Sequence, residues 1–263
     1  MRVFLASTGS GMSKELRDKT VKICRPRYIL ETFFNGEKSC LEAMSIVGND
    51  NFLLDSGAFS YMNGAKVTLS QMDSYIDKYI KFIINYKIKH YFEIDVDNIF
   101  GLDRVEFWRN KMESAIGYQC IPVWHKGRGV EYWKRMCKKY SYIAIGGLVF
   151  HVKKQEYELI RRLVEYAYYC GVKVHGLGFT KTRELKNYKF YSVDSASWVV
   201  SATRGQQIHF FKNGYMKTRQ LEKKGHKVDL PKLVAHNMIE WTKFQKYMDG
   251  VKLQIRHCQN LII

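Results

Sequence analysis

Several features that define special classes of protein are scarce or missing in this sequence of 263 residues. The six cysteines show no paired spacing, which argues against a disulfide framework and indicates reduced thiols. No apolar run approaches the ~18–20 residues of a membrane span, so we expect no membrane partner. Only three prolines, together with 14% aromatic residues, argue against a disordered chain. The segment 1–6 is too short for a signal peptide and is predicted to be a first strand, so we expect a cytoplasmic protein.

Acidic residues are also few: 25 Asp and Glu stand against 43 Lys and Arg, which gives a formal net charge of +18. Such a charge favours a polyanionic partner. Nucleic acid is favoured over a membrane surface because no amphipathic basic helix or lipidation signal is present. Charge shows affinity for polyanions but does not decide between DNA and RNA.

Short apolar runs alternate with longer amphipathic segments along most of the chain, which is typical of a parallel sheet with helical crossovers. Eight candidate strands predict an α/β fold of the (β/α)₈ TIM-barrel type, which needs about 250 residues. An open doubly wound sheet is the alternative, although Ser7–Gly11 is only a weak match to its phosphate loop. The expected strands are Arg2–Ala6, Tyr28–Thr32, Asn51–Leu54, His90–Ile94, Gln119–Trp124, Tyr142–Ile145, Val172–Leu177 and Phe190–Val193. The expected helices are Leu69–Ile84, Leu102–Ile116, Val130–Tyr140, Lys153–Cys170 and Lys181–Lys186.

The alternation of strand and helix patterns ends after residue 194. We therefore expect a catalytic barrel over 1–203 and a basic extension over 204–263 packed on it. A hairpin is predicted over 207–218, because Asn213-Gly214 favours a tight turn. A final helix is expected over 234–248. The basic stretch after the hairpin is either a solvated surface or a nucleic-acid contact. For the second interpretation the candidates are Lys217, Arg219, Lys223 and Lys224.

Polar side chains follow the expected strands at their carboxyl ends, where the active sites of such barrels lie. Asp55, Asp95 and Asp194 end three strands, His125 ends a fourth, and His175 lies in a fifth. A lone Asp at a strand end is usually a cap or loop anchor, but several at one level are harder to explain that way. Two carboxylates that face one glycosidic bond can divide the nucleophile and acid/base roles.

Four short motifs, in order from about Asp55 to Trp198, resemble the tRNA-guanine (queuine) transglycosylase family. Asp55-Ser56-Gly57-Ala58-Phe59 is similar to its Asp-Ser-Gly-Gly-Phe motif, and Gly146-Gly147-Leu148 is similar to its substrate loop. His175-Gly176-Leu177-Gly178 resembles its His-x-x-Gly segment. Tyr191–Ser195 resembles the strand that carries its nucleophilic Asp.

The resemblance implies displacement of guanine from a polynucleotide and insertion of a free 7-deazaguanine base. Asp194 would attack C1′ and form a covalent glycosyl-enzyme, and Asp55 would act as general acid and base. Asp95 would hold the edge of the base. No cofactor or metal is expected for this chemistry. The substrate-binding set would be Ser56, Gly57, Phe59, Asp95, His125, Gly146, Gly147, Leu148, His175 and Gly178.

Two departures from the family pattern bear on the substrate. His125 stands where the family usually has Gln, so this histidine is either a base reader or an anchor for its loop or a phosphate. The RNA enzymes carry a Cys-x-Cys-x₂-Cys zinc module beyond the nucleophile, whereas only Cys258 follows Asp194 here. The sequence therefore looks more like the phage and bacterial branch that modifies DNA, with a base such as preQ0.

Alternatives remain at this point. The polymer is DNA, or alternatively tRNA, and a protein partner or homo-oligomer stays open. A hydrolase with the same Asp pair and a nucleic-acid-binding barrel without catalysis are the other candidates. Phosphate contacts are expected at Lys126 and Arg128, in the loop after the expected strand Gln119–Trp124. Beyond the nucleophile, Arg204 either contacts a phosphate or lies in an ordinary loop.

Overall fold

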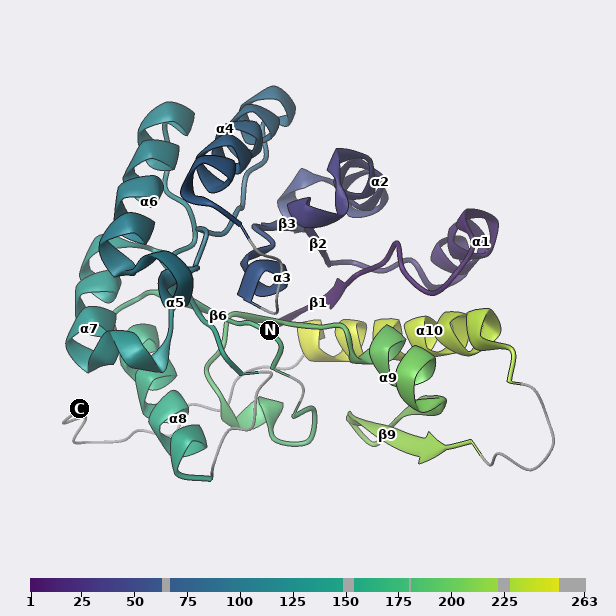
Figure 1. Cartoon of the computed structure of the whole chain (residues 1–263). Helices are drawn as coiled ribbons and strands as arrows, with labels where there is room; N and C mark the ends of the chain where they lie inside the picture. Colours follow the sequence, from purple (N-terminus) through teal and green to yellow (C-terminus); the bar gives the residue numbers. More distant parts are fainter. Residues whose placement is uncertain (63–66, 149–153, 180, 222–227, 251–263) are drawn as a thin grey trace.

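A computed structural model describes residues 1–62, 67–148, 154–179, 181–221 and 228–250. Helices surround a central set of strands, and α10 runs alongside α9 and the hairpin (Figure 1). The strands are β1 Arg2–Ala6, β2 Ile29–Thr32, β3 Phe52–Asp55, β4 Val123–Trp124, β5 Tyr142–Ile145, β6 Lys173–Gly176, β7 Ser192–Ser195, β8 Gln207–Lys212 and β9 Tyr215–Gln220. The α-helices are α1 Lys14–Cys24, α2 Glu37–Val47, α3 Ala58–Met62, α4 Leu69–Tyr86, α5 Asp97–Phe100, α6 Leu102–Ile116, α7 Gly129–Lys139, α8 Lys154–Tyr169, α9 Ser197–Gly205 and α10 Leu230–Gly250. The 3₁₀ turns are η1 Phe33–Asn35, η2 Asn49–Asn51, η3 Lys126–Arg128 and η4 Leu185–Asn187.

Seven strands form one parallel sheet in the order β3-β2-β1-β7-β6-β5-β4. The central strand β1 pairs with β2 and with β7, so that Phe4 lies opposite Asp194. On the other side of β1, Thr32 of β2 lies opposite Asp55 of β3. Because every strand runs in the same direction, the carboxyl ends of all seven lie at one edge.

An extended segment at residues 90–93 links the two outer strands of this sheet. The Phe92 N–H donates to Leu54 O at the end of β3 (3.0 Å), and the Glu93 N–H donates to Ile121 O just before β4 (3.1 Å). Parallel bridges join Leu54 to Tyr91 and Phe92 to Ile121. The ring of pairs therefore returns to its start, as in a (β/α)₈ barrel, with the eighth position held by bridges rather than by a regular strand.

The core has an inner and an outer part. Phe4, Leu30, Leu53, Phe92 and Val123 belong to one buried cluster without any residue from a helix. Neighbouring positions on the same strands belong to two larger clusters that include the helices. Since successive side chains of a strand point to opposite faces, the first cluster fills the barrel and the other two join the barrel to its helices.

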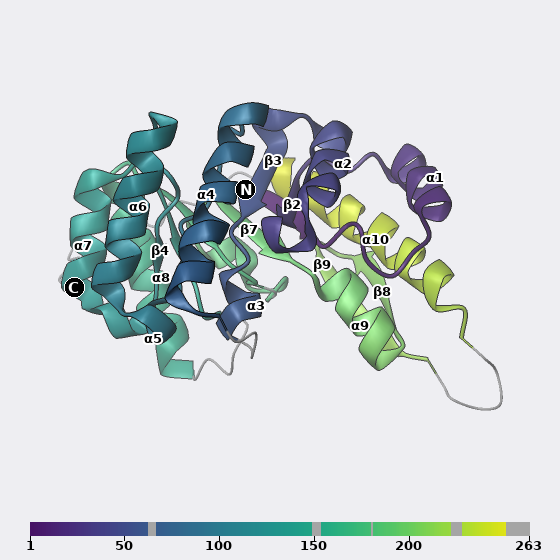
Figure 2. The same ribbon diagram turned by 45° about the horizontal axis from the view of Figure 1, so that its top comes forward.

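The last helix shares this core. α10 packs against α1, β1, α9 and the hairpin, and Figure 2 shows it beside α1 and α9. Gln245 of α10 donates to Val3 O (2.7 Å) and Tyr28 O (2.9 Å), so it is bonded to the first two strand segments of the barrel. The predicted extension thus supplies a helix to the outer layer.

Local sequence explains several of these boundaries. Thr68 and Gln71 form the two reciprocal bonds of a capping box, which fixes the start of α4. Asn213 and Gly214 both have positive φ, 57° and 82°, as the tight turn between β8 and β9 requires. The predicted (β/α)₈-like class with a hairpin and a C-terminal helix is confirmed.

Three expected elements differ from the structure. The expected strand Gln119–Trp124 is a regular strand only at Val123–Trp124. Lys181–Lys186 is not a helix: turns occupy it and a 3₁₀ turn follows at 185–187. Its few apolar positions are too short a pattern to nucleate an α-helix. The expected strand His90–Ile94 is present only as the bridging segment described above.

Candidate active site at the carboxyl ends of the strands

Asp194 is held at the end of β7 by two donors on one of its oxygens. The backbone N–H of Gly178 donates to Oδ1 (2.8 Å), and His175 Nε2 lies 3.1 Å from the same atom. Gly178 has φ 68°, a left-handed conformation that suits glycine and turns its N–H toward the carboxylate. Oδ2 has no hydrogen bond to any described residue.

His175 is fully buried in the barrel and continues the contacts inward. Its Nδ1 lies 2.7 Å from Ser192 Oγ, and Ser192 Oγ lies 2.5 Å from Tyr142 Oη. The sequence motif pointed to His175 and Gly178, and the structure brings both to Asp194. It did not point to Tyr142 or Ser192, whose only signal is that each begins a strand at an inward position.

Asp55 ends β3 and lies near the other two carboxylates. The pKa of Asp55 is raised to about 7, mainly by loss of water around it and then by the charges of Asp95 and Asp194, while hydrogen bonds from Thr32 and from the Gly57 N–H (3.1 Å) oppose the rise. Gly57 has φ 81°, and a Cβ there would lie 2.6 Å from Phe34 Cβ, so the turn after Asp55 requires glycine. A carboxyl group with such a pKa can both give and take a proton near neutral pH.

Asp95 and His125 form a pair over the glycine loop after β5. His125 Nε2 lies 2.7 Å from Asp95 Oδ2. Burial alone would lower the pKa of His125, but the hydrogen bond and the charge of Asp95 outweigh it and raise that pKa. A Cβ on Gly146 would lie 2.4 Å from His125 Cε1, so Gly146 makes room for the imidazole. The side chain that departs from the family pattern is therefore part of the site, bonded to Asp95.

Arg128 occupies a different position from the one expected. Its side chain is 1% exposed and bonds to Glu93 Oε1 (2.8 Å) and to both oxygens of Asp97 (3.0 and 2.9 Å). Glu93 also accepts from Arg109 (3.0 Å) and from the Val123 N–H (2.7 Å). The predicted phosphate contact of Arg128 is therefore wrong, because its guanidinium is buried and its charge is already paired with Glu93 and Asp97. The network fixes the segment that carries Asp95 to the strand that leads to His125.

The other predicted residues fall into three groups. Ser56 and Leu148 are buried beside the site, and Ser56 Oγ has no hydrogen-bond partner in the described residues. Phe59 lies in α3, next to the turn at Gly57, and Gly147 follows Gly146 with φ 77°. Lys126 is exposed and bonds to Glu156 (2.6 Å), and Arg204, Lys217 and Arg219 are exposed. Lys223 and Lys224 lie outside the described residues.

A further carboxyl group near this edge was missed. Glu31 in β2 is 1% exposed; its Oε1 accepts from the Thr32 N–H (3.2 Å) and Asn35 Nδ2 (3.0 Å), while Oε2 has no partner in the described residues. Burial raises the pKa of Glu31. It stands inside an expected strand rather than at its end, and no sequence signal distinguishes it from an exposed strand glutamate.

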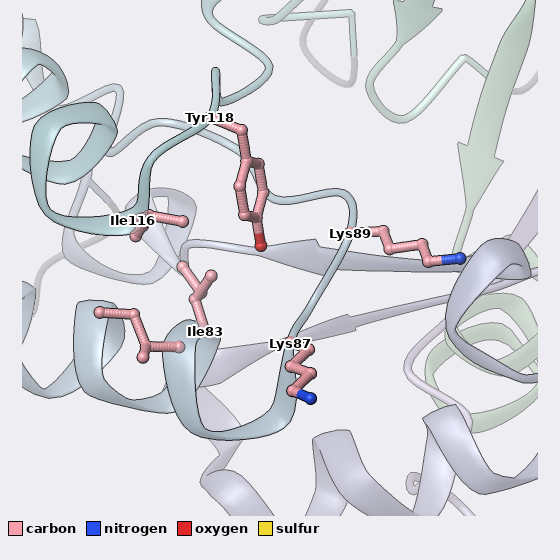
Figure 3. A pocket seen from close by; sticks show the side chains of 6 residues that line it. Ile83, Lys87, Lys89, Ile116 and Tyr118 are labelled. Atoms are coloured by element: carbon pink, nitrogen blue, oxygen red, sulfur yellow. The ribbon is translucent and has the colours of Figure 1, made fainter.

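Two hollows lie outside the carboxylate cluster. One, of about 360 Å³, is lined by residues that include Ile83, Lys87, Lys89, Ile116 and Tyr118 (Figure 3). These residues precede the strand segments, so this hollow is at the opposite end of the barrel from Asp194. The other, of about 410 Å³, lies along α3 and α4, where Tyr75 donates to Ser56 O (2.8 Å).

Neither a metal cluster nor a membrane-spanning helix occurs in the part of the chain that the structure describes. No three His, Cys, Asp or Glu side chains are grouped there so as to hold a metal ion. No described helix is both long enough and apolar enough to cross a membrane.

The fold and this edge define a TIM-barrel-like protein with three carboxylates at the carboxyl ends of its strands. No protein-family model matches the sequence, and no curated protein matches it. A Coccidioides immitis protein assigned as a fructose-1,6-biphosphate aldolase has a similar structure, with a TM-score of 0.54 and 10% identity over 95% of this chain and 89% of that one. This likeness shows the fold alone.

Two other solved structures are less similar. Muconate cycloisomerase from Pseudomonas fluorescens has a TM-score of 0.41 and 11% identity over 67% of this chain and 46% of that one. The carboxyl transferase domain of Rhizobium etli pyruvate carboxylase, with pyruvate, has a TM-score of 0.47 and 12% identity over 94% of this chain and 48% of that one. This chain spans about half the length of each of these two. None of the three is a transglycosylase.

Proposed function

We propose that this protein is an enzyme that exchanges guanine in DNA for a free 7-deazaguanine base through a covalent intermediate on Asp194. The observation that carries the proposal is that two carboxyl groups at this edge differ in hydrogen bonding and in pKa. Asp194 has one oxygen held by His175 and Gly178 and the other unbonded, whereas Asp55 has a pKa raised to about 7. One is prepared to attack and the other to carry a proton.

The chemistry balances with these two groups alone. Asp194 Oδ2 bonds to C1′ as the bond from C1′ to guanine breaks, and protonated Asp55 gives its proton to the leaving base. The incoming base then returns a proton to Asp55 and attacks C1′, which releases Asp194. A carboxyl group that is about half protonated at neutral pH can donate a proton in the first step and accept one in the second, and neither transfer requires much free energy.

The neighbouring groups suit a planar base. Asp95, bonded to His125, offers a carboxylate to the N–H edge of a guanine. The backbone at Gly146 and Gly147 carries no side chain that would keep a ring away. DNA is proposed rather than tRNA because the sequence lacks the Cys-x-Cys-x₂-Cys module that the resemblance associates with the RNA enzymes.

The test is incorporation of labelled guanine, and separately of labelled preQ0, into guanine-containing DNA and into tRNA. We expect label in DNA with the wild type and with Asp77→Asn, an exposed carboxylate on α4 that pairs with Lys111. Asp194→Asn should reduce incorporation by at least about a thousandfold, since the amide is no nucleophile.

Three results would change the proposal. Label in tRNA instead of DNA would keep the mechanism and replace the substrate. Release of guanine without uptake of label would indicate a hydrolase. Exchange at the wild-type rate by Asp194→Asn would show that the mechanism is wrong.

A further inference from the structure

We propose that the outer face of the hairpin β8–β9 binds an unpaired DNA strand and that one base of this strand stacks on the ring of Phe210. The outer face consists of Phe210, Lys212, Tyr215, Lys217 and Arg219. The inference rests on the proposed function for DNA as the polymer, whereas the surface itself follows from the pairing of the two strands.

The register of the hairpin puts these five side chains on one side of it. Phe210 lies opposite Lys217, and Lys212 lies opposite Tyr215, so each ring has a cation directly across the strand pair. Alternate side chains of a strand point to the same face, which adds Arg219 two positions beyond Lys217. Phe210 is 36% exposed, and the three cations are exposed.

The inner face of the hairpin is occupied by α10. His209 is buried and accepts a hydrogen bond from Trp241 Nε1 at its Nδ1 (2.7 Å). Phe211 packs against Phe244 and Tyr247, with ring centroids 6.1 and 5.4 Å away. The hairpin is therefore anchored through one set of alternate side chains, and the other set is left for a partner.

The charge of the outer face is not balanced by acidic groups. Neither strand contains Asp or Glu. Within the described residues, its three cations form no ion pair with a carboxylate; Arg219 instead lies over Phe210 and Lys217 lies near Tyr215, each 5.8 Å from the ring centroid. Exposed cations without a counter-charge favour a polyanionic partner.

The outer face is joined to the barrel near the candidate active site. The Met216 N–H donates to Thr182 Oγ1 (3.2 Å), and Arg183 Cζ lies 4.5 Å from the centroid of the Tyr215 ring. Thr182 and Arg183 belong to the same connection between β6 and β7 as Gly178 of the site. Arg183 is exposed and adds a fourth cation at this junction.

An exposed ring among cations suits an unpaired strand better than a duplex. In a duplex the bases stack on one another, whereas an unpaired strand offers base faces to an aromatic side chain and phosphates to the cations beside it. Tyr215 is half-buried, so Phe210 is the ring with free area, and the flexible Arg219 over it can stack on the base in turn. The proposed reaction also needs such a strand, because a guanine must leave its stack to be exchanged.

The experiment compares the affinity of the full chain for a fluorescein-labelled strand of about twelve thymidines and for the duplex of that strand with oligodeoxyadenosine. Neither probe contains guanine, so neither result depends on base exchange. Phe210→Leu keeps an apolar side chain on the hairpin but removes the ring. We expect its Kd for the single strand to rise by about tenfold, as for the loss of one base–aromatic stack, and its Kd for the duplex to stay at the wild-type value.

The salt dependence separates stacking from loss of charge. Because Phe210→Leu removes no phosphate contact, the slope of log K against log salt should equal that of the wild type. Phe210→Tyr keeps a ring and should bind the single strand as the wild type does.

Phe107→Leu is the matched control. Phe107 on α6 is also exposed (54%) and also lies beside an arginine, with Arg104 Cζ 4.7 Å from its ring centroid. Here, however, the arginine is paired with Asp73 (3.0 Å), so no uncompensated charge adjoins the ring. We expect wild-type affinity for both probes.

Three results would overturn the inference. The first is wild-type affinity of Phe210→Leu for the single strand. The second is an equal loss for the single strand and the duplex, which would show that the ring only supports the hairpin. The third is binding of oligouridine without binding of oligothymidine, which would exclude DNA as the partner of this face. If the affinities agree with the inference but the wild type exchanges no base, the proposed function fails and the binding face stands.

Discussion

At the scale of single residues, the proposed chemistry depends on how close three carboxyl groups lie. Asp55 is half-buried, and the loss of water around it and the charges of Asp95 and Asp194 all act against its ionised form. A pKa of about 7 in the folded state lies well above the ordinary value of about 3.9 for an unfolded chain. Folding therefore takes up a proton at Asp55 between these two values.

This uptake predicts how stability changes with pH. A raised pKa means that the contribution of Asp55 is fully present below about pH 3.9 and is lost as the pH rises through about 7. Asp55→Asn removes the buried charge, so at pH 9 we expect the variant to be more stable than the wild type by up to roughly 4 kcal/mol. At pH 4 the two should differ little. Urea unfolding at both pH values measures this, and an equal difference at pH 4 and pH 9 would contradict the pKa.

Gly146 tests whether the position of His125 matters. A Cβ at Gly146 would lie 2.4 Å from His125 Cε1, so Gly146→Ala must displace the imidazole from Asp95. We expect the KM for DNA guanine to rise by about tenfold or more, and the pKa of His125 to fall as it loses its partner. Gly127→Ala in the next loop is the control, because a Cβ there meets nothing within 4 Å. Equal effects of the two variants would argue against a role for His125.

Some of these residues were predictable from sequence and others were not. Asp55, Asp95 and Asp194 end strands of a parallel sheet, and such ends meet at one edge, so their proximity followed from the pattern. Arg128 was misplaced because its sequence neighbours suggest an exposed basic loop, while its partners Glu93 and Asp97 lie about thirty residues earlier. Ser192 and Tyr142 were not predicted, because only contacts between strands link them to His175.

At the scale of elements, the hairpin β8–β9 presents exposed positive side chains outside the barrel. Lys217 and Arg219 on β9 are exposed, and Arg219 lies over the ring of Phe210 on β8, 5.8 Å from its centroid. We predict that both side chains contact phosphates. The double variant Lys217→Ala, Arg219→Ala should then weaken DNA binding for every sequence and reduce the slope of log K against log salt by about 2.

Lys89→Ala is the control for this prediction, since Lys89 is exposed at the other end of the barrel and pairs with Asp50 (2.6 Å). Binding measured by fluorescence anisotropy over a range of salt concentrations supplies both slopes. If the double variant keeps the wild-type slope, β9 is not part of the interface.

Regular elements were easier to predict than irregular ones. The helix 102–116 and the strand 142–145 match the expected bounds, because each has a clear period and a glycine or polar boundary. The short helices α3, α5 and α9 were not predicted, since four to nine residues are too few to show a helical period. The segment 90–94 has the apolar composition of a strand, but it keeps only bridges to its two neighbours.

At the scale of the whole molecule, a closed ring of strand pairs explains why the site comes together. β1 lies between β2 and β7, and the segment at 90–93 joins β3 to the residues before β4. Asp55 and Asp194, 139 positions apart in the sequence, thereby become near neighbours across β2 and β1. Closure was expected from eight candidate strands, whereas the bonds from α10 to β1 depend on side chains that no periodicity reveals.

The most direct test of the account is a search for the covalent intermediate. Wild type, Asp194→Asn and Asp77→Asn are each incubated with guanine-containing DNA or tRNA without an incoming base, denatured, and measured by intact-protein mass spectrometry. The account predicts a DNA adduct on the wild type and on Asp77→Asn, with guanine released, and none on Asp194→Asn. An adduct that persists in Asp194→Asn would contradict the central claim that Asp194 is the nucleophile.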